Sequence, residues 1–275
     1  MKRNIYVVRN IEIKRDSNTL KLDNSKIPLS IVKNLFVIGN GKVSKSAQNL
    51  LLKNGKTIFY LSSRYQLLGI LSPTFYSSDY KVRLKQYSRG RDLELSKYIV
   101  KSKIEAIERF VGRSLYRHIK KLEDCKSLNE ILGVEGIVST YMFSKLKKEL
   151  EAYGIFDFKK REYRPVKDRV NGVLSFLYTL YYSYLFAEIV SEGMDPYIGF
   201  LHIKRGRHAA FVSDMMEEAR VELTELSIEI LSEVYNDGFD GLYLTNDARR
   251  ILLNKFDEFV QWYENSLFDG FKELL

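Results

Sequence analysis

Residues 201–218, LHIKRGRHAAFVSDMMEE, bring an imidazole, several cations and three carboxylates into one short stretch. Asp214, Glu217 and Glu218 are spaced at i, i+3 and i+4, so a helix places these carboxylates on one face. His202 precedes them across a basic loop that can fold back and bring the imidazole toward the helix. For this segment alone, a solvated acidic face beside an unrelated histidine is the alternative interpretation.

A second candidate carboxylate, Glu135, stands between Gly133 and Gly136 in an otherwise apolar helical stretch. Glycine costs a helix about 1 kcal/mol relative to alanine. Two glycines around an acid therefore indicate that something approaches the backbone closely. The alternative is a helix junction, with Glu135 as a first-turn acid that the helix dipole favours.

Two loops supply cations for phosphate contact. The segment KKREYRPVKDRVNG, residues 159–172, is basic, contains Tyr163 and leads into a long apolar stretch. The second loop follows His202. The predicted DNA-binding residues are Lys159, Lys160, Arg161, Arg164, Lys167, Arg169, Lys204, Arg205 and Arg207. Basic runs of this kind are usually solvated loops, which is the alternative here.

Carboxylates and an imidazole from three separate elements, beside basic loops, are typical of a divalent-metal site. Oxygen-rich sites suit Mg²⁺ or Mn²⁺, and the imidazole leans toward Mn²⁺. The sequence contains no C-x-x-C, H-E-x-x-H or Walker A motif and nothing like a Ser-His-Asp arrangement. Zinc proteolysis, P-loop chemistry and serine hydrolysis therefore have no support.

The net charge of +9 is unevenly divided along the 275 residues. Residues 1–80 contain 13 Lys and Arg and 4 Asp and Glu, whereas the rest contains 31 of each. A basic small region beside a neutral larger one favours an anionic partner, first of all nucleic acid, although lysine that only aids solubility is the alternative. The single cysteine, Cys125, suits a reducing compartment, and we expect a cytoplasmic protein.

The hydrophobic patterns predict an α+β protein. Strand-like runs occur in NIYVVR, IEIKRD, TLKL, NLFVIGNG and KTIFYLSS, with one short helix in SKSAQNLLLKNG capped by Ser44 or Ser46. Later apolar spacings of three and four predict helices over 93–111, 127–154, 171–196, 209–235 and 247–268. We expect a small, mostly-β domain at 1–76, a linker at 77–84, and a larger all-α catalytic domain at 85–275.

The apolar run at 172–190 is long enough to raise the question of a membrane span. It contains Ser175, Thr179, Ser183 and Glu188, together with four tyrosines. A helix that is apolar all round is more often the buried centre of a bundle. We therefore expect no membrane partner.

Four segments, GVEGIVSTYMF, RPVKDRVNGVLSFLYTLYYSYL, GMDPYIGFLH and FVSDMMEEAR, occur in a specific order and spacing. In this the chain resembles the CRISPR-associated spacer-acquisition integrases, the first of the two core CRISPR adaptation proteins, over almost its whole length. The resemblance implies that Glu135, His202 and Glu217 are metal ligands and that Asp214 lies beside the metal as a further catalytic residue. The chain departs from the family pattern at Thr140, where an arginine is common.

The resemblance implies insertion of foreign DNA into a CRISPR array, by attack of a 3′-hydroxyl on a phosphodiester. Water in place of that hydroxyl gives endonuclease activity. Double-stranded and branched DNA, a homodimer and the small second CRISPR adaptation protein are the implied partners, with the basic N-terminal domain extending the DNA path. A metal-dependent, structure-selective endonuclease without integration and a non-catalytic DNA-binding scaffold are the alternatives.

Overall fold

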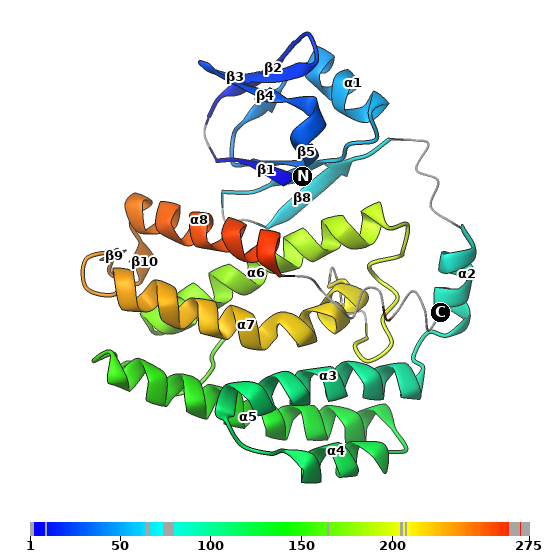
Figure 1. Ribbon diagram of the computed structural model, residues 1–275, viewed down its shortest axis with the longest axis vertical. Coiled ribbons are helices and arrows are strands. Elements are labelled where there is room, and N and C mark those ends of the chain that lie inside the picture. The colour runs from blue at the N-terminus through cyan, green and yellow to red at the C-terminus, as the bar shows by residue number, and fades with distance from the viewer. Residues whose placement is uncertain are drawn as a thin grey trace. The chain divides into compact units, whose positions relative to one another are not determined.

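The computed structural model describes residues 3–8, 10–63, 66–73, 80–163, 165–203, 206, 208–263 and 270. The chain forms two compact units, the first comprising Met1–Tyr80 and Phe186–Met194, and the second Lys81–Leu185 and Asp195–Leu275. The first is strand-rich and the second mainly helical (Figure 1). This confirms the α+β class. Residues 186–194 differ from the expected division, which placed all of 85–275 in one domain.

Two four-stranded sheets build the first unit. One has the order β1-β5-β7-β8 and consists of β1 (Arg3–Val7), β5 (Val32–Ile38), β7 (Ile58–Leu61) and β8 (Leu67–Leu71). In it β1, β5 and β7 are parallel and β8 is antiparallel. The other has the order β4-β3-β2-β6 and consists of β2 (Glu12–Asp16), β3 (Thr19–Leu22), β4 (Ser25–Pro28) and β6 (Lys42–Val43).

The sequence explains why β5 lies inside its sheet. Its residues VKNLFVI are almost continuously buried, as expected for a strand with parallel neighbours on both sides. A one-turn 3-10 helix, Leu29–Ile31, leads into it. Helix α1 (Lys45–Lys53) follows β6 and begins at Ser44, whose Oγ accepts a hydrogen bond from Ala47 N at 3.3 Å, so the first of the two expected caps is the correct one.

Seven helices of the described chain lie at or beyond the start of the second unit. They are α2 (Tyr80–Ser88), α3 (Leu93–Val111), α4 (Tyr116–Glu123), α5 (Leu128–Ala152), α6 (Arg169–Ser191), α7 (Ala210–Val234) and α8 (Asn246–Trp262). α2 begins within the stretch that the sequence assigned to the linker. A short hairpin, β9 (Phe239–Asp240) and β10 (Tyr243–Leu244), joins α7 to α8. Apart from this short hairpin, the second unit is helical, as expected.

Helices α3, α5 and α7 pack against one another in pairs, and α4 lies along α3 and α5 (Figure 1). The ends of α3 are fixed by Asp92, which accepts hydrogen bonds from Glu94 N and Leu95 N, and by Gly112 in a left-handed conformation. Ser127 caps the start of α5, since Glu130 N donates to Ser127 Oγ at 3.3 Å. These caps fix both ends of α3 and the start of α5.

α6 is the apolar helix that raised the question of a membrane span. Over Arg169–Val190 the helix satisfies the requirements of length and composition for a span, with a mean hydropathy of 1.4 in its most apolar window. However, 67% of its most apolar window is buried inside the protein, as in the core helix of a bundle.

The carboxyl group of Glu222 on α7 is largely buried and has few interactions that would stabilise its charge. Its side chain is 18% exposed, Oε2 is buried without a hydrogen-bond partner, and the nearest guanidinium nitrogen, of Arg109, lies 3.7 Å from Oε1. Burial above all, with the charges of Glu225 and Glu218, raises the pKa of Glu222 to about 7 against the opposing effects of a backbone hydrogen bond and Arg109.

Glu222→Gln is therefore expected to raise the free energy of unfolding at about pH 8 by up to about 3 kcal/mol, with little effect at about pH 4. The folded protein retains a proton on Glu222 up to a pKa of about 7, whereas the unfolded chain releases it near 4.5. The wild type consequently loses stability as the pH rises through this window. Urea unfolding at the two pH values checks this, with the exposed Glu105→Gln as control. An equal gain at both pH values would contradict it.

Candidate active site

Asp214 builds the turn that carries His202. This fully buried carboxylate accepts hydrogen bonds from the backbone N–H groups of Phe200 at 2.6 Å, Leu201 at 3.2 Å and His202 at 2.8 Å. A Cβ added to Gly199 would lie 2.9 Å from Asp214 Oδ2 and 2.8 Å from His202 O, so the turn needs glycine there. The predicted role of Asp214 beside the site thus includes shaping the loop.

The imidazole of His202 is oriented by the same carboxylate. Nδ1 lies 2.8 Å from Asp214 Oδ1, and since a carboxylate only accepts, the neutral imidazole carries its proton on Nδ1 and keeps the lone pair on Nε2. Nε2 lies 3.9 Å from Glu217 Oε1. Burial lowers the pKa of His202, but its hydrogen bond to Asp214 and the charges of Glu217 and Asp214 outweigh this effect, so the pKa is raised.

Glu135 on α5 and Glu217 on α7 face each other across Lys103 of α3. The ammonium of Lys103 donates to Glu135 Oε1 and, at 2.5 Å, to Glu217 Oε2. Ser139, one turn after Glu135, also donates to Glu135 Oε1 at 2.8 Å. The side chains of Lys103 and Glu217 are 1% and 2% exposed, whereas Glu135 and His202 are 20% and 26% exposed. The cluster is therefore open to solvent at Glu135 and His202.

Arg220 completes the charge balance of this cluster. Its Nε donates to Glu217 Oε1 at 2.8 Å, and its guanidinium lies 5.4 Å from the centre of the Tyr178 ring. Burial raises the pKa of Glu217, but Arg220 and Lys103 outweigh it and lower the pKa to about 2. Burial lowers the pKa of Lys103, and the charges of Glu217 and Glu135 raise it above its usual value.

The donor chemistry of the three predicted ligands suits a divalent ion. Two carboxylates and an imidazole whose Nδ1–H is held by a third carboxylate form a set typical of metal sites. Among the described residues, however, no group of three or more His, Cys, Asp and Glu has metal-holding geometry. The ammonium of Lys103 stands between the two glutamates. Convergence of Glu135, His202 and Glu217 on one metal stays a prediction.

The glycines around Glu135 do not mark a helix junction, because α5 is continuous from Leu128 to Ala152. That interpretation is wrong, and Glu135 lies well inside the helix. A Cβ added to Gly133 or Gly136 meets no described atom within 4 Å. No segment of the described chain therefore explains the two glycines by close packing.

The basic segment before α6 is held by a buried amide. Asn171 Oδ1 accepts from Arg161 Nη1 and Glu162 N, and its Nδ2 donates to Lys160 O and Asp168 Oδ2. Asp168 also accepts from Asn171 N at 2.7 Å, which caps the start of α6. The guanidinium of Arg161 lies 5.4 Å from the Tyr178 ring that Arg220 also contacts. The Tyr178 ring therefore lies between this loop and Arg220 of the carboxylate cluster.

The predicted DNA-binding residues divide into three groups. Arg161 and Arg169 are committed to internal contacts, since Arg169 donates to Gly241 O and Tyr235 O. Lys159, Lys160 and Lys167 are exposed. Arg164, Lys204, Arg205 and Arg207 lie outside the described residues.

Sequence analysis did not identify Lys103 as part of the site. A signal was present, because Lys103 lies four residues after Ile99 and four before Ile107, on the buried face of α3. A lysine at a core position of an amphipathic helix requires a buried anion. Arg220 is the last residue of the segment FVSDMMEEAR, and the sequence analysis assigned no role to this arginine.

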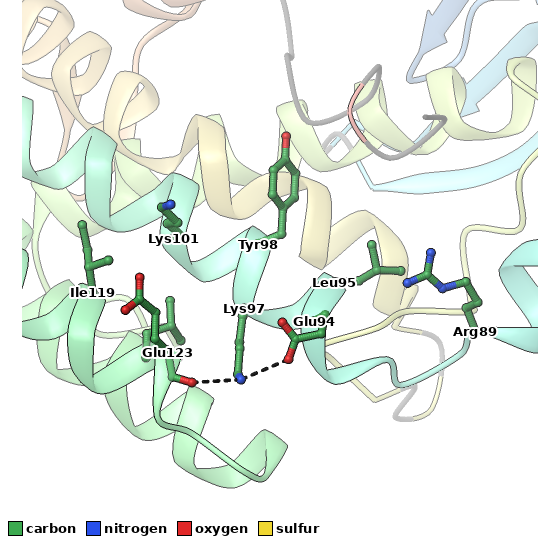
Figure 2. A pocket seen from close by; sticks show the side chains of 9 residues that line it. Arg89, Glu94, Leu95, Lys97, Tyr98, Lys101, Ile119 and Glu123 are labelled. Carbon is green, nitrogen blue, oxygen red and sulfur yellow. Dashed lines mark hydrogen bonds and ion pairs between the residues drawn. The ribbon is translucent and has the colours of Figure 1, made fainter. Parts of the chain in front are cut away.

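A cavity of about 370 Å³ lies on a different face of α3, towards α4. Figure 2 shows Lys97 there, donating to Glu94 Oε1 at 3.1 Å and to Glu123 O at 3.0 Å. Lys101, one turn later on the same face, also lines the cavity (Figure 2). Helical spacing places this face opposite Lys103, so the cavity is separate from the carboxylate cluster.

Comparison with known proteins identifies the family. The model of the family described as CRISPR associated protein Cas1 matches residues 5–258. Two Cas1 proteins of Thermodesulfovibrio yellowstonii, each named a CRISPR-associated endonuclease, are 28% and 25% identical to the chain. The first alignment covers 92% of this chain and 89% of the relative, and the second covers 94% and 86%. The chain belongs to the Cas1 family.

Solved structures share the fold. A Cas1 protein from Thermotoga maritima superposes with a TM-score of 0.80 at 23% identity, covering 96% of this chain and 93% of the other. A casposase bound to its integration product superposes with a TM-score of 0.73 at 22% identity, covering 94% and 82%. The match of the family model confirms the predicted relationship to the first CRISPR adaptation protein.

Proposed function

We propose that this Cas1 protein is a metal-dependent DNA endonuclease and integrase that inserts foreign DNA fragments into a CRISPR array. The observation that carries the proposal is the cluster of Glu135, Glu217 and His202, with the imidazole oriented by Asp214. The names of the curated relatives, which are CRISPR-associated endonucleases, support nuclease chemistry. The casposase with the same fold is bound to an integration product, which supports strand transfer.

Glu135, His202 and Glu217 would hold Mg²⁺ or Mn²⁺, which supplies charge stabilisation at a phosphate and activation of an oxygen nucleophile. His202 offers Nε2 because Asp214 holds the proton on Nδ1. Arg220 fixes Glu217 from the buried side. Glu135 and His202 form the solvent-facing side of the cluster, where a DNA phosphate can approach.

DNA and a second adaptation protein are the proposed partners. Solved structures with the same fold include a Cas1–DNA complex and a Cas6-RT-Cas1–Cas2 complex. We further propose double-stranded and branched DNA as substrates, a homodimer as the assembly and the cytoplasm as the location. The basic N-terminal region would extend the DNA path.

The proposal is tested by incubating the protein and its second adaptation protein with a labelled DNA fragment and a repeat-containing plasmid. Joining of the label to the plasmid in the presence of Mn²⁺ or Mg²⁺, and its loss on chelation, is the expected result. Cleavage of branched DNA without joining would support the endonuclease alternative. Metal-independent DNA binding without cleavage or joining would support the scaffold alternative.

Alanine at Lys159, Lys160 and Lys167 together is expected to reduce the slope of log affinity against log salt by about 2–3. Each exposed lysine that contacts a phosphate releases counterions on binding. Fluorescence anisotropy of labelled duplex DNA at several salt concentrations measures the slope.

A variant with alanine at Lys145, Lys147 and Lys148 of α5 removes the same charge elsewhere in the second unit. It is expected to leave the slope closer to that of the wild type. Equal slopes for the two triple variants would show that DNA binding follows net charge rather than the loop before α6.

A further inference from the structure

Lys103 is a fully buried cation that the predicted chemistry does not use. Its side chain is 1% exposed, and its ammonium donates to Glu135 Oε1 and Glu217 Oε2. These two contacts come from helices that each pack against α3. A buried ammonium is tolerated only when such paired anions surround it.

The contacts of Lys103 compete with those of a divalent ion. Glu217 Oε2 is engaged by Lys103 and Glu217 Oε1 by Arg220, so both oxygens of this carboxylate already face cations. Of the two cations, Lys103 is the one that also contacts Glu135. An ion that joins Glu135 to Glu217 would therefore occupy the space held by the Lys103 ammonium, since two cations in direct contact repel strongly at low dielectric.

We propose that Lys103 is an internal placeholder cation: it holds Glu135 and Glu217 facing each other when no metal is bound, and it withdraws from one or both when a divalent ion binds. The inference rests on the proposed metal dependence and adds a positioning residue to it. Lys103 prevents repulsion between the carboxylates in the metal-free protein, at the expense of metal affinity. Its removal thus weakens the metal-free fold and strengthens metal binding.

A role for Lys103 in structure alone leads to a different expectation. If the lysine only kept the helices together, its loss would disorder the carboxylates and weaken metal binding. If it were a fixed neighbour of the bound metal, wild-type protein would retain both lysine contacts after metal addition. Metal affinity and the position of Nζ therefore distinguish the placeholder from both.

The experiment titrates Mn²⁺ into the full-length wild type, Lys103→Met and Lys101→Met by calorimetry. Lys101→Met is the matched control, because Lys101 is an exposed lysine on the opposite face of the same helix. Lys103→Met is expected to bind Mn²⁺ at least about tenfold more tightly than the wild type, and Lys101→Met with wild-type affinity. Melting temperatures add a second measurement: Lys103→Met should melt below the wild type without metal and recover with saturating Mn²⁺.

If Lys103→Met does not fold without metal, Lys103→Gln and wild-type crystals soaked in Mn²⁺ replace it. The bound ion is then expected between Glu135 and Glu217, with Lys103 Nζ beyond hydrogen-bond distance of at least one of them. Unchanged or weaker Mn²⁺ binding in the Lys103 variants, or an ion bound with both lysine contacts intact, would overturn this inference alone. Absence of Mn²⁺ binding in every protein would overturn the proposed metal dependence with it.

Discussion

Glu217→Gln is expected to reduce metal-dependent strand transfer on the order of a thousandfold, or about 4 kcal/mol in the activation barrier. Glu217 contacts Lys103 and Arg220 and lies next to His202, so it interacts with both cations and with the imidazole of the cluster. The amide keeps the shape of the side chain but loses the charge that a divalent ion requires. Rates of fragment joining at several Mn²⁺ concentrations measure the effect.

Loss of folding has to be separated from loss of activity in this variant. Removing one partner of a buried ion cluster typically costs about 3–5 kcal/mol, so circular dichroism must establish that Glu217→Gln is folded at the assay temperature. Glu135→Gln is a second variant of the cluster, at a partly exposed position. Glu222→Gln is the matched control, because Glu222 lies on α7 like Glu217. Strand transfer within tenfold of wild type for a folded Glu217→Gln protein would show that Glu217 is no metal ligand.

The sequence predicts those elements whose ends carry local signals. The bounds of α3 follow from the cap at Asp92 and the left-handed Gly112, and the start of α5 follows from the Ser127–Glu130 capping box. Short strands without a hydrophobic alternation, such as β4 with SKIP, were missed because their pairing partners define them. The assignment of residues 186–194 to the first unit likewise depends on packing rather than on sequence pattern.

In the candidate site too, the sequence predicts contacts between residues that are close in the chain but not contacts between residues that are far apart in it. Asp214 and Glu217 are one helical turn apart, so their common location follows from spacing alone. Lys103 contacts Glu135 and Glu217 across 32 and 114 residues of sequence, and no local pattern records such contacts. Composition predicts that Arg161 binds phosphates. In the structure its guanidinium donates a hydrogen bond to the buried Asn171, a contact that composition does not reveal.

Asp214→Asn is expected to weaken Mn²⁺ binding and strand transfer by about 10–100-fold, which is less than the effect of Glu217→Gln. In the wild type, Oδ2 accepts from Phe200 N and Leu201 N, and Oδ1 accepts from His202 N and Nδ1. Asparagine has one accepting oxygen, so its amide nitrogen must face donors on one side. We expect a loss of about 3 kcal/mol in stability from the unpaired donors.

The tautomer of His202 distinguishes a positioning role of Asp214 from a purely structural one. If the asparagine oxygen stays with the turn, its NH₂ group faces His202 and forces Nδ1 to accept, which moves the proton to Nε2 and removes the lone pair for the metal. Nitrogen-15 NMR of the three histidines is expected to show this change for His202 in Asp214→Asn. Ser213→Ala is the control, because Ser213 Oγ contacts His208 at 2.8 Å and its loss should perturb only His208.

Excess Mn²⁺ should restore part of the activity of Asp214→Asn, since a positioning group changes metal affinity without removing a ligand. A folded Asp214→Asn protein that is inactive at every Mn²⁺ concentration, while Glu217→Gln retains activity, would show that Asp214 is the ligand and Glu217 its support.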